Sequence, residues 1–330
     1  MATIREVAKL ANVSIGVVSR LLNHDETLSI TNETRERVLR AVKELNYVNT
    51  KNRSVKRGNV FGILQWYSPK QELDDPYYLS IRLGVENYCE EHHIQVVRVF
   101  KSDNDFLDML SNVDALICIG KFHKQDIVQF EKITPRMVLV DMDTHRVEYH
   151  TISLDFENAM KDVMEYLFSR DYQQIGYLGG KEYLSIDHLY PDQRKKIFIQ
   201  FCEEHRISYK QFMREDSFSI ESGYNMMKSL IVENCLPRAV FAASDAIAIG
   251  AMRALSEHHI QIPKDLAIIG FDDISSAKYT SPPLSTVHAP AYEMGTYAAS
   301  FLHTQYNTII NTGIPLHMTL PCSLVIRQSS

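Results

Sequence analysis

The sequence of 330 residues predicts an all-α head at the N-terminus, followed by an α/β core with two doubly wound parallel sheets. Apolar residues recur at helical spacing through the first part of the chain, and from residue 60 onward short β-rich apolar runs alternate with longer helical patterns. The net charge changes sign at the same position, near residue 60. Residues 1–59 carry 11 Lys and Arg against six Asp and Glu, a net charge of +5. The rest of the chain carries 24 Lys and Arg against 35 Asp and Glu, or −11. The head is therefore the part expected to meet a polyanion.

Three short helices are expected in the head. Ser14 is a good N-cap for the second, and the third begins near Thr31 or Asn32 with Glu33 in its first turn. The apolar positions are Ile4, Val7, Ala8 and Leu10 in the first helix, Val17, Val18, Leu21 and Leu22 in the second, and Val38, Leu39, Val42 and Leu45 in the third. This layout is typical of a helix-turn-helix, whose second helix enters the major groove of DNA.

The other side of the second helix is the candidate DNA-reading surface. It carries Ile15, Gly16, Ser19 and Arg20, and a tract with four cations and no acid follows at residues 51–57. A plain three-helix cap without a ligand is the alternative for the head, and a solvated linker is the alternative for the tract. The exposed Ser and Arg, the basic balance and the basic tract together favour DNA binding.

Strand-like and helix-like patterns alternate through the core. The apolar β-rich runs are residues 60–64, 94–100, 115–119 and 137–140, then 175–178, 239–242 and 266–270. Helical patterns between them include residues 78–91, 158–170 and 246–258. One series of four strands ends near Asp141 and a second series begins after Asp155, which predicts two sheets, one in each of two lobes.

Ligands of paired α/β lobes normally bind in the cleft at the carboxyl ends of the strands. The residues that follow the predicted strands are Gln65, Trp66 and Tyr67, then Gly120 and Lys121, then Asp141, Ser244 and Asp245, and finally Gly270, Phe271, Asp272 and Asp273. Such aromatic, amide, hydroxyl and carboxylate groups suit a sugar. Alternatives stay open, because a lone Trp is often a core residue, Asp272 and Asp273 could cap a turn, and Asp245 is the expected N-cap of the next helix.

Other classes of protein have little support. The N-terminus MATIREVAKL does not resemble a secretion leader and no run approaches about 18 apolar residues, so a cytoplasmic protein is expected. The five cysteines lack a C-x-x-C pattern, which argues against a disulfide framework and a zinc knuckle. The doublets His92-His93 and His258-His259 are interpreted as helix C-termini. GYLGGKE at residues 176–182 fails the phosphate-loop pattern, and neither catalytic residues, a cofactor nor a metal is predicted.

The stretch TIREVAKLANVSIGVVSRLLN, residues 3–23, resembles the DNA-binding head of the LacI/GalR family of bacterial transcriptional repressors. The family signature is of the type V-A-x-x-A-x-V-S followed by T-V-S-R-V-L-N. The residues that fit it in order and spacing are Val7, Ala8, Ala11, Val13, Ser14, Val18, Ser19, Arg20, Leu22 and Asn23. The DNA-binding residues that the resemblance implies in the head are Thr3, Ser14, Ile15, Gly16, Val17, Ser19, Arg20 and Asn23.

Two positions of the second helix depart from the family, and so does the hinge after the head. Val17 stands where relatives usually have Thr, and Gly16 stands where many use a side chain to read a base. In relatives an apolar hinge residue, usually Leu, wedges into the minor groove. Lys56 holds that position here, with Val55 before it. Either Val55 is a smaller wedge in a shifted register, or the hinge contacts phosphates through Lys51, Arg53, Lys56 and Arg57.

The resemblance continues to the end of the chain. DPYYLSIRLGVE, ASDAIAIGAMRAL and IIGFDDISSAKYTSPPLSTV are similar to blocks of the family's core, whose fold is periplasmic-binding-protein-like. The candidate effector-binding residues are Trp66, Asp75, Tyr77, Lys121, Arg194, Ser244, Phe271 and Asp272. The PYY stretch looks closest to the branch that contains the galactose and evolved-β-galactosidase repressors. Galactose or a β-galactoside is therefore the first effector expected.

The resemblance implies a helix-turn-helix domain at residues 1–48, a hinge at 49–59 and an effector-binding and dimerisation core at 60–330. The two lobes of the core are expected at about 60–154 plus 288–320 and 155–287 plus 321–330. The function implied is a sugar-responsive repressor, binding operator DNA as a homodimer without a membrane anchor. The alternatives are a transport-type sugar-binding protein with no DNA role and an enzyme acting on a phosphosugar or nucleoside.

Overall fold

The computed structural model describes residues 4–22, 30–45, 59–142, 148–185, 188–307 and 314–330. The chain divides into two compact units, Met1–Asn59, called the head, and Val60–Ser330, called the core. Among the described residues no helix has the length and apolar character needed to span a bilayer.

The head consists of α1 (Ile4–Leu10), α2 (Ile15–Leu22) and α3 (Asn32–Glu44). Ser14 caps α2 as predicted, because its Oγ accepts a hydrogen bond from the backbone N–H of Val17 at 3.3 Å. The buried apolar residues that hold the three helices together are Val7, Ala8, Ala11, Val18, Leu21, Val38 and Ala41.

Two of the apolar positions expected in the head are exposed, Leu10 of α1 at 47% and Leu39 of α3. Leu39 is 50% exposed, and Ala41 is buried in its place. Val38, Ala41, Val42 and Leu45 follow the i, i+3, i+4, i+7 spacing of one helix face, from which Leu39 is rotated by about 100°.

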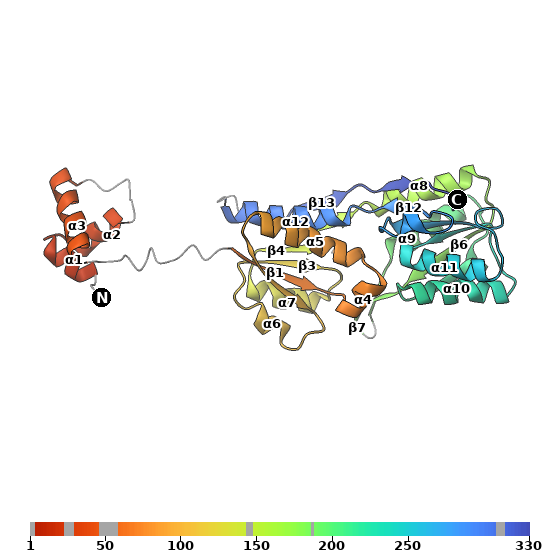
Figure 1. Cartoon of the computed structure of the whole chain (residues 1–330), viewed down its shortest axis with the longest axis horizontal. Coiled ribbons are helices and arrows are strands. Elements are labelled where there is room, and N and C mark those ends of the chain that lie inside the picture. Colours follow the sequence, from red (N-terminus) through yellow and green to blue (C-terminus); the bar gives the residue numbers. More distant parts are fainter. Residues whose placement is uncertain (1–3, 23–29, 46–58, 143–147, 186–187, 308–313) are drawn as a thin grey trace. The chain divides into compact units, whose positions relative to one another are not determined.

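The first sheet of the core has six strands in the order β13-β5-β4-β3-β1-β2, all paired in parallel. The strands are β1 (Val60–Gln65), β2 (Gln95–Phe100), β3 (Ala115–Ile119), β4 (Met137–Val140), β5 (His150–Leu154) and β13 (His317–Leu320). Its helices are α4 (Pro69–Asp74), α5 (Tyr77–Glu91), α6 (Phe106–Met109), α7 (Lys124–Ile133) and α12 (Ala291–Asn307). Figure 1 shows α5 and α12 together on one face of this sheet, with α6 and α7 on the other.

The second sheet also has six strands, in the order β14-β12-β11-β10-β6-β9, and the β12–β14 pair is antiparallel. The strands are β6 (Ile175–Gly180), β9 (Met213–Asp216), β10 (Ala239–Ala242), β11 (Ala267–Asp272), β12 (Ser285–His288) and β14 (Ser323–Val325). Its helices are α8 (Phe156–Ser169), α9 (Gln193–Glu204), α10 (Ile220–Val232) and α11 (Asp245–Glu257). A separate hairpin, β7 (Glu182–Ser185) with β8 (His188–Tyr190), follows β6.

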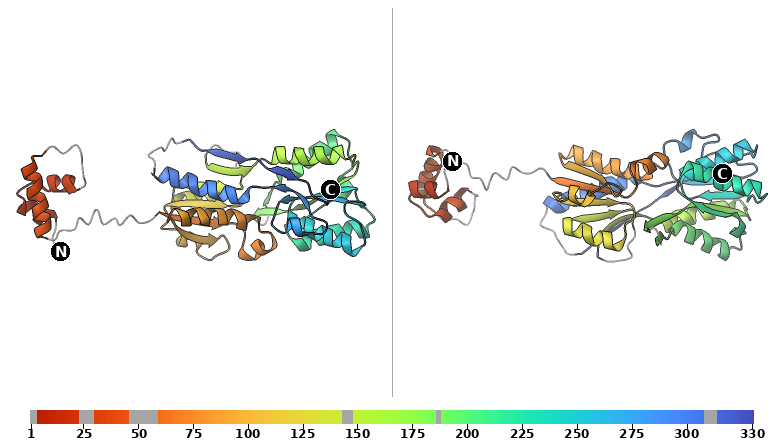
Figure 2. Two further views of the ribbon diagram at one scale, coloured as in Figure 1. Left: turned by 45° about the horizontal axis from the view of Figure 1, so that its top comes forward. Right: turned by 90° about the horizontal axis from the view of Figure 1, so that it is seen from below.

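The chain passes between the two lobes three times. It leaves the first sheet after β5 to enter α8, returns from β12 to α12, and leaves again from β13 to β14. The two further views in Figure 2 show both lobes with helices on each side of their sheets. Such an arrangement lets one lobe rotate against the other while each sheet stays intact.

Each lobe contains one pair of helices that cross in backbone contact. In the first lobe the crossing of α5 and α12 is formed by Gly84 and Gly295. In the second lobe the crossing of α10 and α11 is formed by Gly223 and Gly250. A Cβ atom at any of these four glycines would lie within 2.1 Å of a carbonyl oxygen of the partner helix, so no larger residue fits without separating the helices.

The histidine doublets end helices, as the sequence predicts. The Nδ1 atoms of His92, His205 and His258 bond the carbonyl oxygens four residues earlier at 2.9, 3.0 and 2.8 Å. The residue after each of them adopts a left-handed conformation, with φ between 55° and 59°. In the part of the chain that the structure describes, no group of His, Cys, Asp and Glu side chains is arranged to hold a metal ion.

The strand predictions are right in the centre of both sheets and incomplete at their edges. The first series of strands does not end near Asp141, because β5 and β13 extend the first sheet to six strands. β5 reads HTISL and β13 reads HMTL, so polar residues interrupt the apolar signal of both. β1, β6 and β11 are also longer than their apolar runs, and β11 includes Asp272.

Candidate functional site

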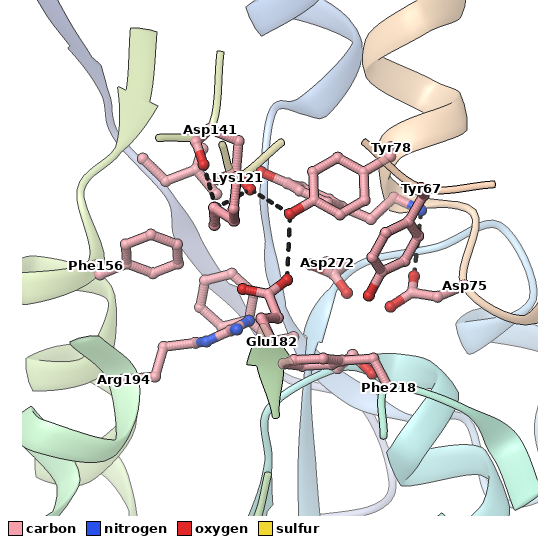
Figure 3. A pocket seen from close by; sticks show the side chains of 14 residues that line it. Tyr67, Asp75, Tyr78, Lys121, Asp141, Phe156, Glu182, Arg194, Phe218 and Asp272 are labelled. Carbon is pink, nitrogen blue, oxygen red and sulfur yellow. Dashed lines mark hydrogen bonds and ion pairs between the residues drawn. The ribbon is translucent and has the colours of Figure 1, made fainter. Parts of the chain in front are cut away.

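A pocket lies between the two lobes at the carboxyl ends of the central strands, with an empty volume of about 370 Å³ (Figure 3). The first lobe contributes Tyr67, Asp75, Tyr77, Tyr78, Lys121, Asp141 and Leu154, and the second lobe contributes Phe156, Glu182, Arg194, Phe218, Ser244, Phe271 and Asp272. Seven of the eight predicted effector-binding residues are among them.

Arg194, on the first turn of α9, is the cation of the second lobe's side of the pocket. Its side chain is 11% exposed, its Nε donates to the Asp192 carboxylate at 3.0 Å, and its Nη1 donates to the carbonyl oxygen of Ala243 at 2.6 Å. The guanidinium carbon lies 5.2 to 5.3 Å from the ring centres of Phe156, Phe218 and Phe271. These contacts fix the guanidinium plane, and Nη2 donates no hydrogen bond to the described residues. Arg194 is therefore not part of a solvated face.

Asp75 and Asp272 bring two carboxyl groups to the pocket from opposite lobes (Figure 3). Burial raises the pKa of Asp75 to about 6, against a hydrogen bond that its Oδ1 accepts from the backbone N–H of Tyr77 at 3.2 Å. Burial and the nearby Asp75 and Asp245 carboxylates raise the pKa of Asp272 well above its usual range. The Asp272 side chain accepts no hydrogen bond from the described residues, whereas Asp273 pairs with Arg327 at 2.6 Å. The ion pair of Asp273, and no hydrogen bond to the Asp272 side chain from the described residues, therefore stabilises the turn that follows β11.

Asp141 and Lys121 form a buried ion pair on the first lobe's side, with Nζ 2.5 Å from Oδ2. The hydroxyls of Tyr77 and Tyr78 donate to the same carboxylate at 3.1 and 2.9 Å. Asp141 directly follows β4 and has a φ of 62°, a left-handed conformation that Asp tolerates better than most residues. The cluster holds its two tyrosine rings at the pocket wall, where Tyr77 is 9% exposed.

The N-cap of α11 is Ser244 and not Asp245, contrary to the prediction. Ser244 is the N-cap of α11, because its Oγ accepts from the N–H of Ile247 at 3.3 Å. Asp245 lies one residue later, where its carboxylate accepts from Thr286 Oγ1 at 2.6 Å and from the N–H of Ile274 at 2.9 Å. The backbone of Ser244 is extended, so its short side chain reaches the N–H of the third helical residue. Asp245 is the first helical residue and cannot make this contact. Ser244 still lines the pocket.

Trp66 does not line this pocket. Its indole packs among core residues and lies beside a different cavity, formed with Gln71, Lys181, Tyr183 and other residues. The neighbouring Tyr67 occupies the place at the pocket that the sequence suggested for Trp66. The lone tryptophan is thus mostly a packing residue.

Glu182 is the pocket residue that the sequence gave least reason to choose. It begins β7, a strand with no apolar signal, and its Oε1 lies 3.2 Å from the Tyr78 hydroxyl of the opposite lobe, whose proton is donated to the nearer Asp141 carboxylate. Burial raises its pKa to about 7, although Lys121 and Arg194 oppose this rise. The other residues missed are Tyr67, Tyr78, Asp141, Leu154, Phe156 and Phe218, of which Tyr67 and Asp141 were recognisable as residues at strand ends.

Glu182→Gln is expected to change how the stability of the core depends on pH. Burial disfavours the charged carboxylate, so this group contributes stability below about pH 4.5 that is lost as the pH rises through about 7. Between pH 5 and pH 8 the free energy of unfolding of the wild type should therefore fall relative to that of the variant, by up to about 3 kcal/mol. Urea denaturation at a series of pH values measures this, with Glu131→Gln, an exposed residue of α7, as the control. A difference that does not vary with pH would contradict the prediction.

The predicted DNA-reading residues that the structure describes gather along α2 and its N-cap. Ser14, Ile15, Gly16 and Arg20 are exposed, and Val17 and Ser19 are half-buried. The remaining predicted DNA-binding residues, Thr3, Asn23, Arg53, Val55 and Lys56, lie outside the described residues. The alternatives for the hinge residues stay predictions for the same reason.

Gly16→Ala is expected to stabilise α2. A Cβ atom at this position would meet nothing closer than the Oγ of Ser14 at 3.8 Å, so packing within the head does not require glycine. Alanine in a helix interior is favoured over glycine by about 1 kcal/mol. Amide hydrogen exchange on the full-length chain should show roughly fivefold stronger protection in α2. Weaker protection in the variant would show that the glycine serves the fold.

Comparison with known proteins gives the family. Residues 3–49 match the model for bacterial regulatory proteins of the lacI family, and residues 164–330 match a periplasmic binding protein-like domain. The HTH-type transcriptional regulator GalR of Streptococcus thermophilus is 38% identical over 335 residues, covering 100% of both chains. The HTH-type transcriptional repressor MelR of Bacillus subtilis is 34% identical over 345 residues, covering 100% of this chain and 97% of the other.

Solved structures show the same fold. The transcriptional regulator CelR in complex with cellobiose superimposes with a TM-score of 0.71 and 23% identity, covering 100% of both chains. These matches extend over the helical head and both lobes of the core. The chain belongs to the lacI family of bacterial regulatory proteins.

Proposed function

We propose that the protein is a cytoplasmic transcriptional repressor that binds operator DNA through its head as a homodimer and responds to a sugar bound between the lobes of its core. Galactose or a β-galactoside is the proposed effector. The proposal assigns DNA binding to residues 1–48, the hinge to 49–59, and effector binding and dimerisation to the core.

The observation that carries the effector proposal is the set of groups that meets in the pocket. Asp75 and Asp272 face it from opposite lobes, and Arg194 lies between three phenylalanine rings beside them. Carboxylates accept hydrogen bonds from sugar hydroxyls, the guanidinium donates to sugar oxygens, and the rings cover the apolar face of a pyranose. A sugar held from both lobes also favours a closed cleft over an open one.

Closure of the cleft supplies the proposed regulation. The lobes are joined by three chain crossings, so binding that draws them together changes their relative orientation in both protomers of a dimer. We propose that this change decides whether the two hinges at residues 49–59 order on the operator. Effector and operator affinities are then linked with a single coupling free energy.

The DNA part of the proposal rests on the charge and shape of the head. The net charge of residues 1–59 is +5, against −11 for the rest of the chain, and Arg20 and Ser14 are exposed along α2. A transport-type sugar-binding protein and an enzyme acting on a phosphosugar need no such basic helical head. The head therefore favours the repressor over both alternatives.

Selection from a genomic DNA library at fixed salt tests the proposal directly. The full-length protein should enrich a pseudo-palindromic site, and galactose or lactose, but not glucose, should change its affinity for that site. Removal of residues 1–58 should abolish DNA binding. Failure to enrich any palindromic site, with or without sugar, would refute the repressor function. Sugar binding without DNA binding would instead support the transport-type alternative.

A further inference from the structure

One tyrosine hydroxyl lies between two carboxyl groups where the lobes meet (Figure 3). The Tyr78 oxygen is 2.9 Å from Oδ2 of Asp141 and 3.2 Å from Oε1 of Glu182. Tyr78 is in α5 and Asp141 follows β4, so both belong to the first lobe. Glu182 begins β7 and belongs to the second lobe. The approach of Tyr78 and Glu182 is therefore a contact across the cleft.

The single proton of the Tyr78 hydroxyl can be donated to only one of these two carboxyl groups. Asp141 is the nearer of the two, and it also accepts from the Tyr77 hydroxyl at 3.1 Å and from the Nζ of Lys121 at 2.5 Å. Three such donors favour the charged form of Asp141. The Tyr78 proton is therefore donated to Asp141, and the Tyr78 oxygen faces Glu182 as an acceptor. The contact across the cleft is a hydrogen bond only when Glu182 itself carries a proton.

The surroundings of Glu182 also favour its neutral form. The titratable groups that face it from the first lobe are Tyr67, Tyr78, Lys121 and Asp141, and those from the second lobe are Tyr190, Asp192 and Arg194. The two cations are already paired, Lys121 with Asp141 and Arg194 with Asp192. Burial raises the pKa of Glu182 to about 7, and Asp141 and Asp192 add to the rise while Lys121 and Arg194 oppose it.

The other two carboxyl groups of the pocket that lack a cation differ from Glu182 in what they face. Asp75 already accepts from the backbone N–H of Tyr77, and Asp272 accepts no hydrogen bond from the described residues. Hydroxyl groups of a bound sugar can donate to both, which stabilises their charged forms. Glu182 instead faces a phenol oxygen whose proton is already donated elsewhere. Glu182 is therefore the carboxyl group expected to keep a proton when sugar is bound.

We propose that closure of the cleft on a sugar is coupled to the uptake of a proton by Glu182, which then donates a hydrogen bond to the Tyr78 oxygen and joins the two lobes. The inference rests on the proposed function, because it assumes that sugar binding closes the cleft. In an open cleft the Glu182 carboxyl is in water and is charged at neutral pH. Sugar affinity, and with it the effect of sugar on operator binding, therefore depends on pH.

The direction and size of this dependence follow from the two states of the cleft. The closed cleft holds the proton more tightly than the open one, so sugar affinity is highest at low pH and falls as the pH rises through about 7. With an ordinary pKa of 4.5 for Glu182 in the open cleft, the affinity should fall about tenfold between pH 6 and pH 8.

Isothermal calorimetry on the full-length protein tests the proposal with galactose and with lactose. Titrations at pH 7 in PIPES and in Tris, whose ionisation enthalpies differ, give the number of protons taken up. The wild type should take up about half a proton for each sugar bound. A second series from pH 6 to pH 8 measures the expected tenfold fall in affinity.

Glu182→Gln separates this proton from those of other groups. The amide of glutamine can donate to the Tyr78 oxygen at every pH, as a protonated Glu182 would. At pH 8 the variant should therefore bind sugar about tenfold more tightly than the wild type, with most of the proton uptake lost. Glu131→Gln, an exposed position on α7, is the matched control and should keep the wild-type pH dependence. Undiminished proton uptake in Glu182→Gln would assign the proton to another group and overturn the proposal.

Tyr78→Phe removes the acceptor of the proposed hydrogen bond and should narrow the difference in affinity between pH 6 and pH 8 to about threefold or less. Tyr77→Phe is its control, because the Tyr77 hydroxyl donates to Asp141 and does not face Glu182, and it should keep the larger difference. The full difference in Tyr78→Phe would overturn the hydrogen bond between the lobes. Sugar binding with neither pH dependence nor proton uptake would mean that a sugar hydroxyl donates to a charged Glu182, and would overturn the inference alone. Absence of sugar binding at every pH would overturn the proposed function as well.

Discussion

Replacing Arg194 by methionine is expected to weaken sugar binding by about 100-fold or more and to make operator binding insensitive to sugar. The guanidinium is held by Asp192, Ala243 and three phenylalanine rings, so its free N–H groups are already oriented before a sugar enters. Each hydrogen bond from a charged donor contributes about 1.5–3 kcal/mol, and two of them account for the expected loss. Methionine keeps the apolar contacts with the rings while removing every donor.

Calorimetry with galactose and with lactose measures the loss, and operator titrations with and without sugar measure the regulation. Lys196→Met is the matched control, since Lys196 is an exposed residue of the same helix. Arg194→Lys should lose most of the affinity too, because an ammonium group cannot donate in the plane that Asp192 and Ala243 define. Undiminished sugar binding by Arg194→Met would remove Arg194 from the site.

Gly250→Ala is expected to destabilise the core by about 3 kcal/mol, the upper part of the range for overpacked interiors. The added Cβ would lie 1.9 Å from the carbonyl oxygen of Ile220 and 2.7 Å from the backbone nitrogen of Tyr224. Both contacts are with backbone atoms of α10, which cannot rotate away as a side chain can. The gain in helix propensity from alanine, about 1 kcal/mol, is smaller than this cost.

Urea denaturation of the full-length protein measures the effect through the transition of the core. Ser256→Ala, an exposed position on α11, controls for substitution in the same helix and should change stability by less than about 0.5 kcal/mol. Wild-type stability in Gly250→Ala would mean that α10 and α11 separate without penalty, contrary to the close crossing that Gly223 and Gly250 form.

The centre of each sheet could be predicted from the sequence, because β3, β4 and β10 are buried on both faces and read as unbroken apolar runs. The edge and late strands could not. β5 and β13 carry polar residues, and β7 and β8 form a hairpin away from both sheets, so none of them has the signal of a buried strand. In the head, Leu39 was assigned to the buried face because that face passes instead through Ala41, a small residue that contributes little apolar signal.

The pocket could be predicted in part, through the rule that ligands bind at the carboxyl ends of parallel strands. That rule finds Lys121, Asp141, Ser244 and Asp272, which lie at such ends. Phe156 and Phe218 were missed because they follow β5 and β9, two strands that were not predicted, and Glu182 because β6 extends two residues beyond its predicted run. Which of two adjacent residues caps a helix, as with Ser244 and Asp245, depends on backbone angles that the sequence leaves open.

The three crossings between the lobes also bear on how the chain is made. The helix α5 emerges early in synthesis, yet its glycine face is covered by α12, which begins at Ala291, and the first sheet gains its edge strand with β13 at residues 317–320. The second sheet is completed by β14 at residues 323–325. Neither lobe can therefore finish folding on the ribosome while the last part of the chain is still unmade, and both reach their native packing almost together. A nascent core would expose the uncovered side of α5 for most of its synthesis, which is a demand on chaperones that a domain built from one continuous stretch would not make.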